Sequence, residues 1–164
     1  MLQGRVHILG DNISADYIIS AKHLSKVSGI DELIPYVLED VTSDFYKRIQ
    51  PNDIILAGEN FGSGSSREHA ALVIKQMKIS CVVAKSFGRN FYRNGINLGL
   101  PLIEAKWKDI NDLDILKIDM QGGQLFNLRQ NTSIPFNPLP AIMEEILKAG
   151  GMIPYFQTHK GFSI

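Results

Sequence analysis

The sequence predicts an α/β domain with a partly parallel sheet, flanking helices and a small antiparallel sheet. From Ile54 to Ala105, apolar strand-like runs alternate with segments of helical periodicity, which is typical of parallel strands joined by helices. After Asp109 the pattern changes to short alternating segments separated by turns, as in antiparallel strands. With 164 residues, 45% of them hydrophobic, the chain can bury one substantial core, so we predict a single domain over residues 1–164.

The first third of the chain is expected to contain one strand, a loop-rich stretch and two short helices. The stretch GRVHILG has strand character, and DNISADYIISAKHL is a polar turn that leads into an extended segment. The apolar spacing then suggests helices. The expected elements are a strand at 4–10, an extended segment within 11–24, and helices at 30–40 and 42–49.

The rest of the chain is expected to alternate strands and helices and then to form an antiparallel sheet. The expected elements are strands at 53–58, 79–87 and 101–105, helices at 67–78 and 88–99, antiparallel strands at 113–120, 122–128 and 131–136, and a closing amphipathic helix that starts near 139 and ends before Gly150 and Gly151.

Charge and cysteine content exclude several classes of function. The 17 basic residues equal the 17 acidic ones, so no net field attracts nucleic acid or an anionic membrane. Cys81 is the only cysteine, which excludes a disulfide framework or a multi-cysteine metal site in this chain, and its apolar surroundings predict an inert buried thiol. We find neither a signal sequence nor about 18 consecutive apolar residues, so we expect a cytoplasmic protein without membrane contacts.

The stretch GENFGSGSSREHA, residues 58–70, has the character of an anion-binding turn. It follows a predicted strand and precedes a predicted helix, which directs backbone N–H groups and the positive end of the helix dipole into one small space. It lacks the Gly-Lys-Ser/Thr ending of a P-loop and the third glycine of the dinucleotide motif. It also lacks the Gly-x-Ser-x-Gly elbow of hydrolases. We therefore predict a small anion rather than a nucleotide.

Two interpretations compete for the polar residues after this turn. Ser65 and Glu68 are spaced as a capping box, which would make them purely structural. Arg67, however, would lie in the first helical turn, where a cation opposes the helix dipole, so we expect it to need an anionic partner. A guanidinium is suited to bidentate carboxylate recognition, and we favour a binding site. His69 could act as a base on the same side, although a structural role is favoured.

Three segments carry a resemblance: GENFGSGSSREHA, AKSFGRNFYRNGINLGLP and GDNISADYIIS. In order and spacing they resemble the small subunits of 3-isopropylmalate dehydratase, the stand-alone swivel domains of the aconitase family. The resemblance spans nearly the whole chain and implies a swivelling β/β/α fold. It also implies that Ser65 is the catalytic serine and Arg67 the substrate-binding arginine, in a turn with Gly64 and Ser66, and that Asp16 is an active-site carboxylate.

The chemistry implied by the resemblance is dehydration and rehydration of a hydroxy di- or tricarboxylic acid. In the family, a 4Fe–4S cluster held by three cysteines assists departure of the hydroxyl. This chain has Cys81 alone, so we expect it to bind no cofactor itself. The resemblance thus implies a hetero-oligomer with a cluster-bearing large subunit, whose active site lies at the interface.

The residues after Asp16 bear on the substrate. Homoaconitase-like members have Tyr-Leu-Arg-Thr in the loop that reads the substrate, where this chain has His23, Leu24, Ser25 and Lys26. The absence of an arginine favours an alkyl-substituted malate, namely 2- and 3-isopropylmalate of leucine biosynthesis, over homocitrate or citrate. Lys26 leaves a homoaconitase-like or related alkylmalate dehydratase as an alternative.

Further questions stay open at this point. Arg93 or Asn94, on the predicted helix at 88–99, could line the cavity, since ligands of such sheets gather beyond the strands' carboxyl ends. A carboxylate-binding module without chemistry is a second alternative. Nucleic-acid binding is disfavoured by the balanced charge and by the absence of a basic aromatic stripe.

Overall fold

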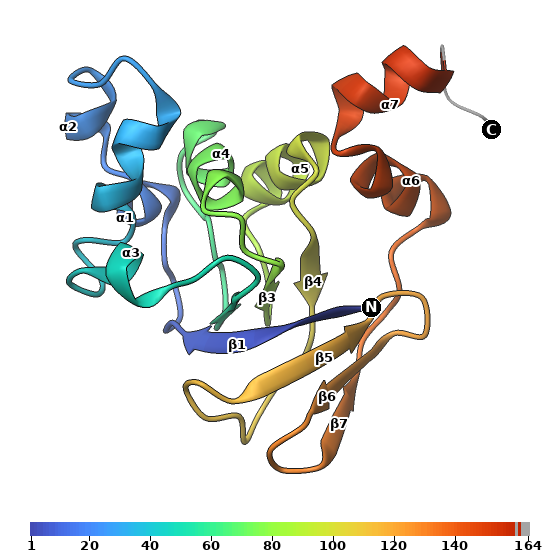
Figure 1. The fold of residues 1–164 in the computed structure, drawn as a ribbon. Helices are drawn as coiled ribbons and strands as arrows, with labels where there is room; N and C mark the ends of the chain where they lie inside the picture. The colour runs from blue at the N-terminus through green and yellow to red at the C-terminus, as the bar shows by residue number, and fades with distance from the viewer. Residues whose placement is uncertain (160, 162–164) are drawn as a thin grey trace.

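The computed structural model describes residues 1–159 and 161, and its centre is one mixed seven-stranded sheet (Figure 1). The strand order in space is β4-β3-β2-β1-β5-β6-β7. The strands are β1 (Leu2–Ile8), β2 (Ile54–Ala57), β3 (Cys81–Ala84), β4 (Leu102–Glu104), β5 (Ile115–Asp119), β6 (Gln124–Asn127) and β7 (Thr132–Pro135).

Strand β1 joins a parallel half of the sheet to an antiparallel half. Its second part pairs in parallel with β2, with Val6 opposite Ile54, and its first part pairs antiparallel with β5, with Leu2 opposite Ile118. Strands β2, β3 and β4 are parallel to one another, whereas β5, β6 and β7 form antiparallel pairs. The predicted α/β class is confirmed, and the small antiparallel sheet proves to be a continuation of the parallel one.

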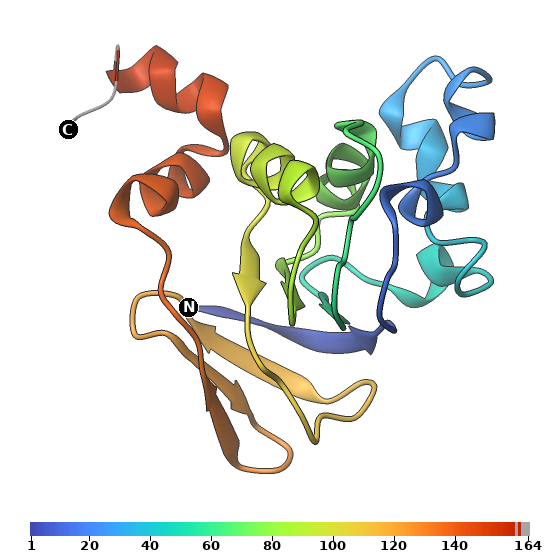
Figure 2. The same cartoon turned by 180° about the vertical axis from the view of Figure 1, so that it is seen from behind.

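The helices lie on one side of the parallel half, and the hairpins of the antiparallel half lie on the other side (Figures 1 and 2). The helical elements are α1 (Ala15–Ile18), α2 (Ala21–Leu24), the 3₁₀ helix η1 (Ile30–Tyr36), α3 (Phe45–Arg48), α4 (His69–Gln76), α5 (Arg89–Leu98), α6 (Ala141–Ala149) and α7 (Met152–His159).

The helices differ from the expectation in three places. The segment expected to be extended contains the one-turn helices α1 and α2, because the Ser14 hydroxyl accepts a hydrogen bond from the Tyr17 N–H at 3.3 Å and caps α1. Residues 30–36 form a 3₁₀ helix, since the ring of Pro35 would clash with the carbonyl four residues earlier in an α-helix. Beyond the predicted stop at Gly150, where φ is +89°, a further helix, α7, follows.

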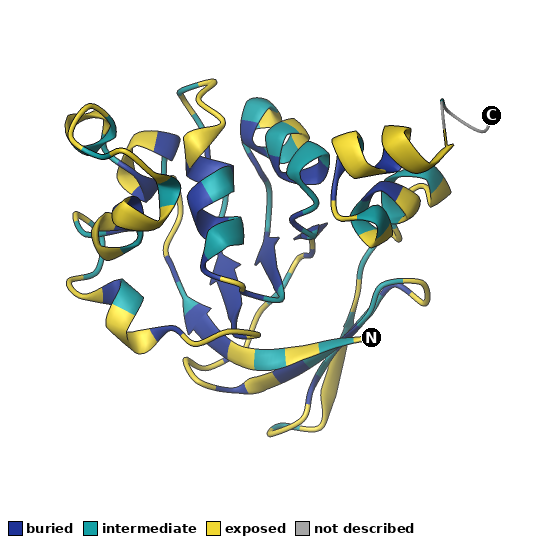
Figure 3. Ribbon diagram, turned by 45° about the horizontal axis from the view of Figure 1, so that its top comes forward, coloured by how far each residue is buried: buried dark blue, intermediate teal, exposed yellow. Residues whose placement is uncertain are grey.

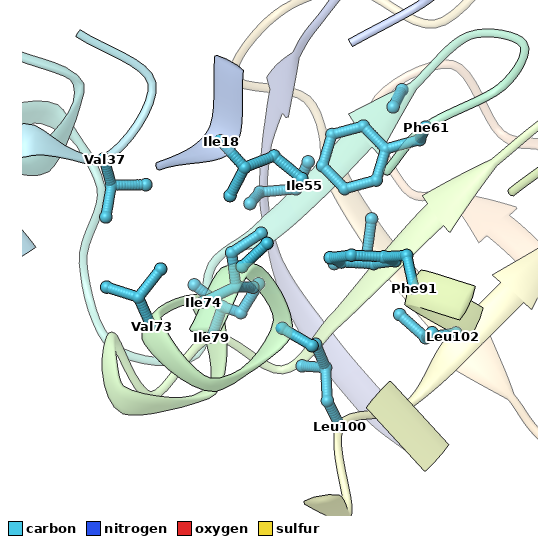
Figure 4. Packing of buried hydrophobic residues seen from close by; sticks show 14 of the residues in the cluster. Ile18, Val37, Ile55, Phe61, Val73, Ile74, Ile79, Phe91, Leu100 and Leu102 are labelled. Carbon is cyan, nitrogen blue, oxygen red and sulfur yellow. The ribbon is translucent and has the colours of Figure 1, made fainter. Parts of the chain in front are cut away.

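Two hydrophobic cores cover the two faces of the parallel strands. Ile55 points toward the helices, where it joins a cluster with Phe61 and Phe91 (Figure 4). Val82 of β3 belongs to the same cluster. The alternate residues Ile54 and Val83 pack on the opposite face with residues of β5 and β6. Burial on both faces explains why β2 and β3 are continuous apolar runs in the sequence (Figure 3).

Cys81 lies in the second core and is fully buried. Burial raises the pKa of its thiol far above the ordinary value, so the thiolate that reacts or binds metals is not populated. This agrees with the inert thiol predicted from the sequence.

Within residues 1–159 and 161, none of the helices combines the length and apolar character needed to cross a bilayer.

A buried carboxylate ties β1 to the start of β2. Asp53 is 4% exposed and accepts hydrogen bonds from Arg5 at 3.0 and 3.2 Å and from the Gln50 N–H at 2.9 Å, and its Oδ2 lies 2.7 Å from His7 Nε2. Burial opposes ionisation, but hydrogen bonds from Arg5 and His7 outweigh it and hold the pKa of Asp53 below its ordinary value.

The lowered pKa predicts a stability that depends on pH. Because the folded protein binds the Asp53 proton more weakly than the unfolded chain, this stabilisation is present above the unfolded pKa of about 3.9 and is lost as the pH falls through the folded pKa. Asp53→Asn is expected to lower the free energy of unfolding by ~1–3 kcal/mol at pH 7, and by less near pH 3. Urea unfolding at both pH values measures this. Asp109→Asn, an exposed aspartate without an ion pair within the described chain, is the control. An equal loss at both pH values contradicts the prediction.

Candidate active site

The glycine-serine turn lies beyond the carboxyl end of β2, beside the loop that leaves β1. The Gly62 N–H donates to the Ile13 carbonyl at 2.7 Å, and the Ala15 N–H donates to the Ser63 carbonyl at 2.8 Å. These bonds extend the parallel pairing past the strands themselves, with Ser14 opposite Ser63. As a result, the segment that carries Asp16 is held next to the segment that carries Ser65.

Glycine is required in this turn for two different reasons. At Gly62 φ is +75°, and a Cβ would lie 2.2 Å from the Phe91 ring, so a side chain would meet both backbone strain and a buried aromatic. At Gly64 φ is +89°, and a Cβ would meet only Ser14 Cβ at 3.9 Å, so the constraint there is conformational. The turn is therefore closely packed at Gly62 and open to solvent at Gly64.

Three predicted site residues converge at this turn. The Arg67 guanidinium donates to the Asp16 carboxylate in a close ion pair that spans 51 positions of sequence. The Ser65 hydroxyl accepts a hydrogen bond from the Arg67 N–H at 3.2 Å. The Arg67 and Asp16 side chains are 44% and 57% exposed, so both remain accessible to a ligand. An exposed ion pair is worth ~0–1 kcal/mol, which a carboxylate ligand could displace or share.

The predicted capping box is wrong. Helix α4 begins at His69 with Glu68 as its N-cap residue, and no side chain caps it. The Ser65 hydroxyl bonds to the N–H two residues on, inside the loop, and Arg67 precedes the helix instead of lying in its first turn. The argument from the helix dipole therefore weakens, while the observed pair with Asp16 supplies the anionic partner that Arg67 was expected to need.

The backbone of the turn offers hydrogen-bond donors for the predicted anion. The N–H groups of Gly64, Ser65 and Ser66 donate to no acceptor within residues 1–159 and 161, and these residues are exposed or half-buried. These three residues immediately precede Arg67 in the chain. Free N–H groups beside a guanidinium form a suitable environment for a carboxylate.

The segment expected to read the substrate, His23 to Lys26, comprises the last two residues of α2 and the two residues after it. His23 Nε2 lies 2.6 Å from a Glu39 carboxylate oxygen, and the imidazole stacks on the Tyr36 ring with the centroids 3.9 Å apart. Hydrogen bonds from Lys22 and then from His23 lower the pKa of Glu39. His23 therefore anchors α2, while Ser25 and Lys26 are exposed.

Leu24 lines a small cavity with both polar and apolar walls beside helix α4. The cavity measures about 260 Å³, and the residues that line it include Leu24, Val27, Leu33, Leu72 and His69. His69 follows Arg67 by two residues, so this cavity borders the loop that carries the candidate catalytic groups. His69 is exposed at the start of α4.

Helix α5 supplies further contacts to the turn. The Asn94 amide donates to the Ser66 carbonyl at 3.2 Å, whereas Arg93 is exposed and forms no described ion pair or hydrogen bond within residues 1–159 and 161. No motif in the sequence pointed to Ser86 as a residue near the site. Its hydroxyl accepts a hydrogen bond from the Asn60 N–H at 2.9 Å and donates one to Glu59 at 2.6 Å. Its position just after β3 was the available signal, because such positions meet at one sheet edge.

Comparison with known proteins places this geometry in a family. The sequence profile of the aconitase C-terminal domain matches residues 22–106. The 3-isopropylmalate dehydratase small subunit 1 of Thermotoga maritima is 50% identical over 99% of this chain and 98% of its own length. This chain belongs to the aconitase family, among the 3-isopropylmalate dehydratase small subunits.

Further relatives agree with this assignment to the aconitase family. The isopropylmalate/citramalate isomerase small subunit of Methanocaldococcus jannaschii is 44% identical over 96% of this chain and 94% of its own length. The crystal structure of a 3-isopropylmalate dehydratase from the same organism superposes with a TM-score of 0.91 at 39% identity, covering 97% of this chain and 95% of that one. The resemblance seen in three sequence motifs is thus confirmed over the whole fold.

The residues of this aconitase-family chain do not fit an iron–sulfur cluster. Such a cluster needs several thiolates, whereas the sequence has one cysteine, and burial keeps that thiol protonated. Among residues 1–159 and 161, no three His, Cys, Asp or Glu side chains are grouped as metal ligands. No catalytic step is therefore assigned to a metal held by this chain.

Proposed function

We propose that this chain is the small subunit of a hydro-lyase that interconverts 2-isopropylmalate and 3-isopropylmalate by dehydration and rehydration. The observation that carries the proposal is the convergence of Ser65, Arg67 and Asp16 at one exposed turn, in a chain half identical to a 3-isopropylmalate dehydratase small subunit. In this reaction a proton leaves the carbon next to a carboxylate, the neighbouring hydroxyl leaves, and water then adds in the opposite sense.

The three side chains suit different parts of that reaction. Arg67 binds a substrate carboxylate through its planar guanidinium, together with the free N–H groups of Gly64 and Ser66. Ser65 Oγ accepts the proton from the substrate carbon and returns it during rehydration. Asp16 holds the Arg67 guanidinium in place through their ion pair.

Ser65 needs help to act as a base. A helix N-terminus contributes up to ~2 kcal/mol, about one and a half pKa units, and only within the first turn. Because α4 begins four residues after Ser65, this contribution is smaller still. Arg67 and exclusion of water when the site closes must therefore provide most of the stabilisation of the deprotonated serine.

The proposal includes a partner. Departure of the hydroxyl calls for a Lewis acid, which Cys81 cannot assemble, so a large subunit would carry the 4Fe–4S cluster and meet this chain at the turn. Relatives of this chain are named as small subunits, which supports a large-subunit partner. The balanced charge of this chain favours a small-molecule substrate over nucleic acid.

The cavity lined by Leu24 and Leu72 supports an alkyl-substituted substrate. Aliphatic side chains form part of its lining, beside the polar Ser28 and His69. Among the segment His23 to Lys26 only Lys26 could pair with a third carboxylate, because His23 is engaged by Glu39. A branched alkyl group is stabilised in such a space by about 25 cal/mol per Å² of buried apolar surface. Citramalate, named for the Methanocaldococcus jannaschii relative, is the smaller alternative substrate.

Reconstitution tests this function. The chain alone is expected to be colourless and inactive, and the complex with a cluster-bearing large subunit, assembled anaerobically, is expected to turn over 3-isopropylmalate. Citramalate and homocitrate are assayed in parallel, and the large subunit alone is the control. Turnover or iron–sulfur absorbance in the isolated chain, or preference of the complex for homocitrate, would contradict the proposal.

A further inference from the structure

We infer that Asn94 is a positioning residue for the reaction, which holds the loop of Ser65 and Arg67 through the Ser66 carbonyl. This inference rests on the proposed function, because it concerns the same site. The sequence placed Asn94 near the cavity without assigning it a role. The structure shows its amide directed at the loop backbone, with an Nδ2 to oxygen distance of 3.2 Å.

Within residues 1–159 and 161, the Asn94 side chain makes the sole hydrogen bond that ties the backbone of this loop to a residue outside it. From Gly64 to Arg67, two backbone groups are hydrogen-bonded within the described chain: the Arg67 N–H bonds to Ser65, inside the loop, and the Ser66 carbonyl bonds to Asn94. On either side the chain is well fixed, by the Ala15 N–H bond to Ser63 and by helix α4. Without Asn94, this stretch would be restrained only by its ends and by the exposed Arg67–Asp16 pair.

One face of α5 is built to support the whole turn. Gly88 precedes the helix, and a Cβ there would lie 2.6 Å from the Gly62 carbonyl oxygen, which shows how closely the two backbones approach. Phe91, one turn on, is 2% exposed and lies under Gly62. Asn94, the next turn on, reaches Ser66. Residues three apart share a face of a helix, so α5 contacts the turn at successive points along its length.

From this geometry we expect the loss of the Asn94 side chain to affect catalysis more than stability. Asn94 is half-buried and its hydrogen bond is near the surface, where a net contribution of ~0.5–1.5 kcal/mol is usual. The loop, in contrast, places the proton acceptor and the carboxylate-binding groups together. Misplacement of catalytic groups by about 1 Å can cost ~10²-fold in rate.

Asn94→Ala and Asn94→Asp test the inference. Alanine removes the amide, and aspartate keeps its shape but presents an acceptor to the Ser66 carbonyl in place of the N–H donor. In the reconstituted complex both variants are expected to lower kcat and raise KM for 3-isopropylmalate, with kcat/KM reduced ~10–100-fold. The melting temperature is expected to fall by a few degrees at most. Asn90→Ala, on the same helix and without a described side-chain hydrogen bond, is the matched control.

A second measurement needs no partner subunit. Trypsin cleaves after Arg67, so the rate at which the peptide ending at Arg67 appears reports how freely this loop opens in the isolated chain. Asn94→Ala is expected to speed this cleavage several-fold relative to wild type and Asn90→Ala. Unchanged cleavage overturns the inference whether or not the complex is active, and faster cleavage with unchanged kinetics overturns the positioning role. Inactivity of the wild-type complex would instead count against the proposed function.

Discussion

Ser65→Ala is expected to lower kcat of the reconstituted enzyme by at least ~10²–10⁴-fold, the contribution usual for a positioned proton-transfer group. The structure places the Ser65 hydroxyl in an exposed loop, where it accepts one hydrogen bond from the Arg67 N–H at 3.2 Å. Since Arg67 and the backbone N–H groups remain, KM for 3-isopropylmalate is expected to change little. Steady-state kinetics of the complex, corrected for folded fraction, measure the effect.

Two control variants separate catalysis from loop structure. Ser65→Asp keeps an acceptor for the Arg67 N–H and is expected to retain stability without activity, because aspartate forms the same local turn. Ser63→Ala, in the same loop and without a described side-chain bond, is expected to be near wild type. The catalytic assignment of Ser65 is abandoned if Ser65→Ala turns over within about threefold of wild type.

Arg67→Lys is expected to reduce kcat/KM roughly 10- to 150-fold, which corresponds to ~1.5–3 kcal/mol for a charge-assisted carboxylate bond. Lysine keeps the positive charge but lacks the planar fork that binds a carboxylate bidentately. It also cannot bind Asp16 and a substrate through separate N–H groups of one plane, as the guanidinium can. The loss is expected mainly in KM, because the Ser65 hydroxyl is unaffected.

The same exchange elsewhere provides the control for Arg67. Arg129→Lys lies after β6 in the antiparallel half, away from the turn, and is expected to leave kinetics unchanged. Gel filtration of each variant with the large subunit checks that the complex still assembles. Kinetics of Arg67→Lys equal to those of Arg129→Lys would return Arg67 to a solvated surface role.

The sequence alone mispredicted one feature of the site and missed another, because each depends on a hydrogen bond that local spacing does not reveal. Ser65 and Glu68 have the spacing of a capping box, but the Ser65 hydroxyl is already bonded to the Arg67 N–H, and α4 starts at His69. The contacts of His23 with Glu39 and Tyr36, which orient its ring, were not predicted. Neither outcome follows from local spacing.

The sequence by itself determined the order of the seven strands, the helices α4, α5 and α6 that follow β2, β3 and β7, and the glycine-rich turn that brings Ser65 and Arg67 close together in the chain. These are local properties: periodicity reports which faces are buried, and glycine marks backbone conformations that other residues avoid. Tertiary structure alone decided that β1 joins the two halves of the sheet, that Asp16 meets Arg67 across 51 positions, and that Asn94 reaches Ser66 across 28. The physical reason is that strand register and helix packing select these partners, and no short window of sequence contains both members of such a pair.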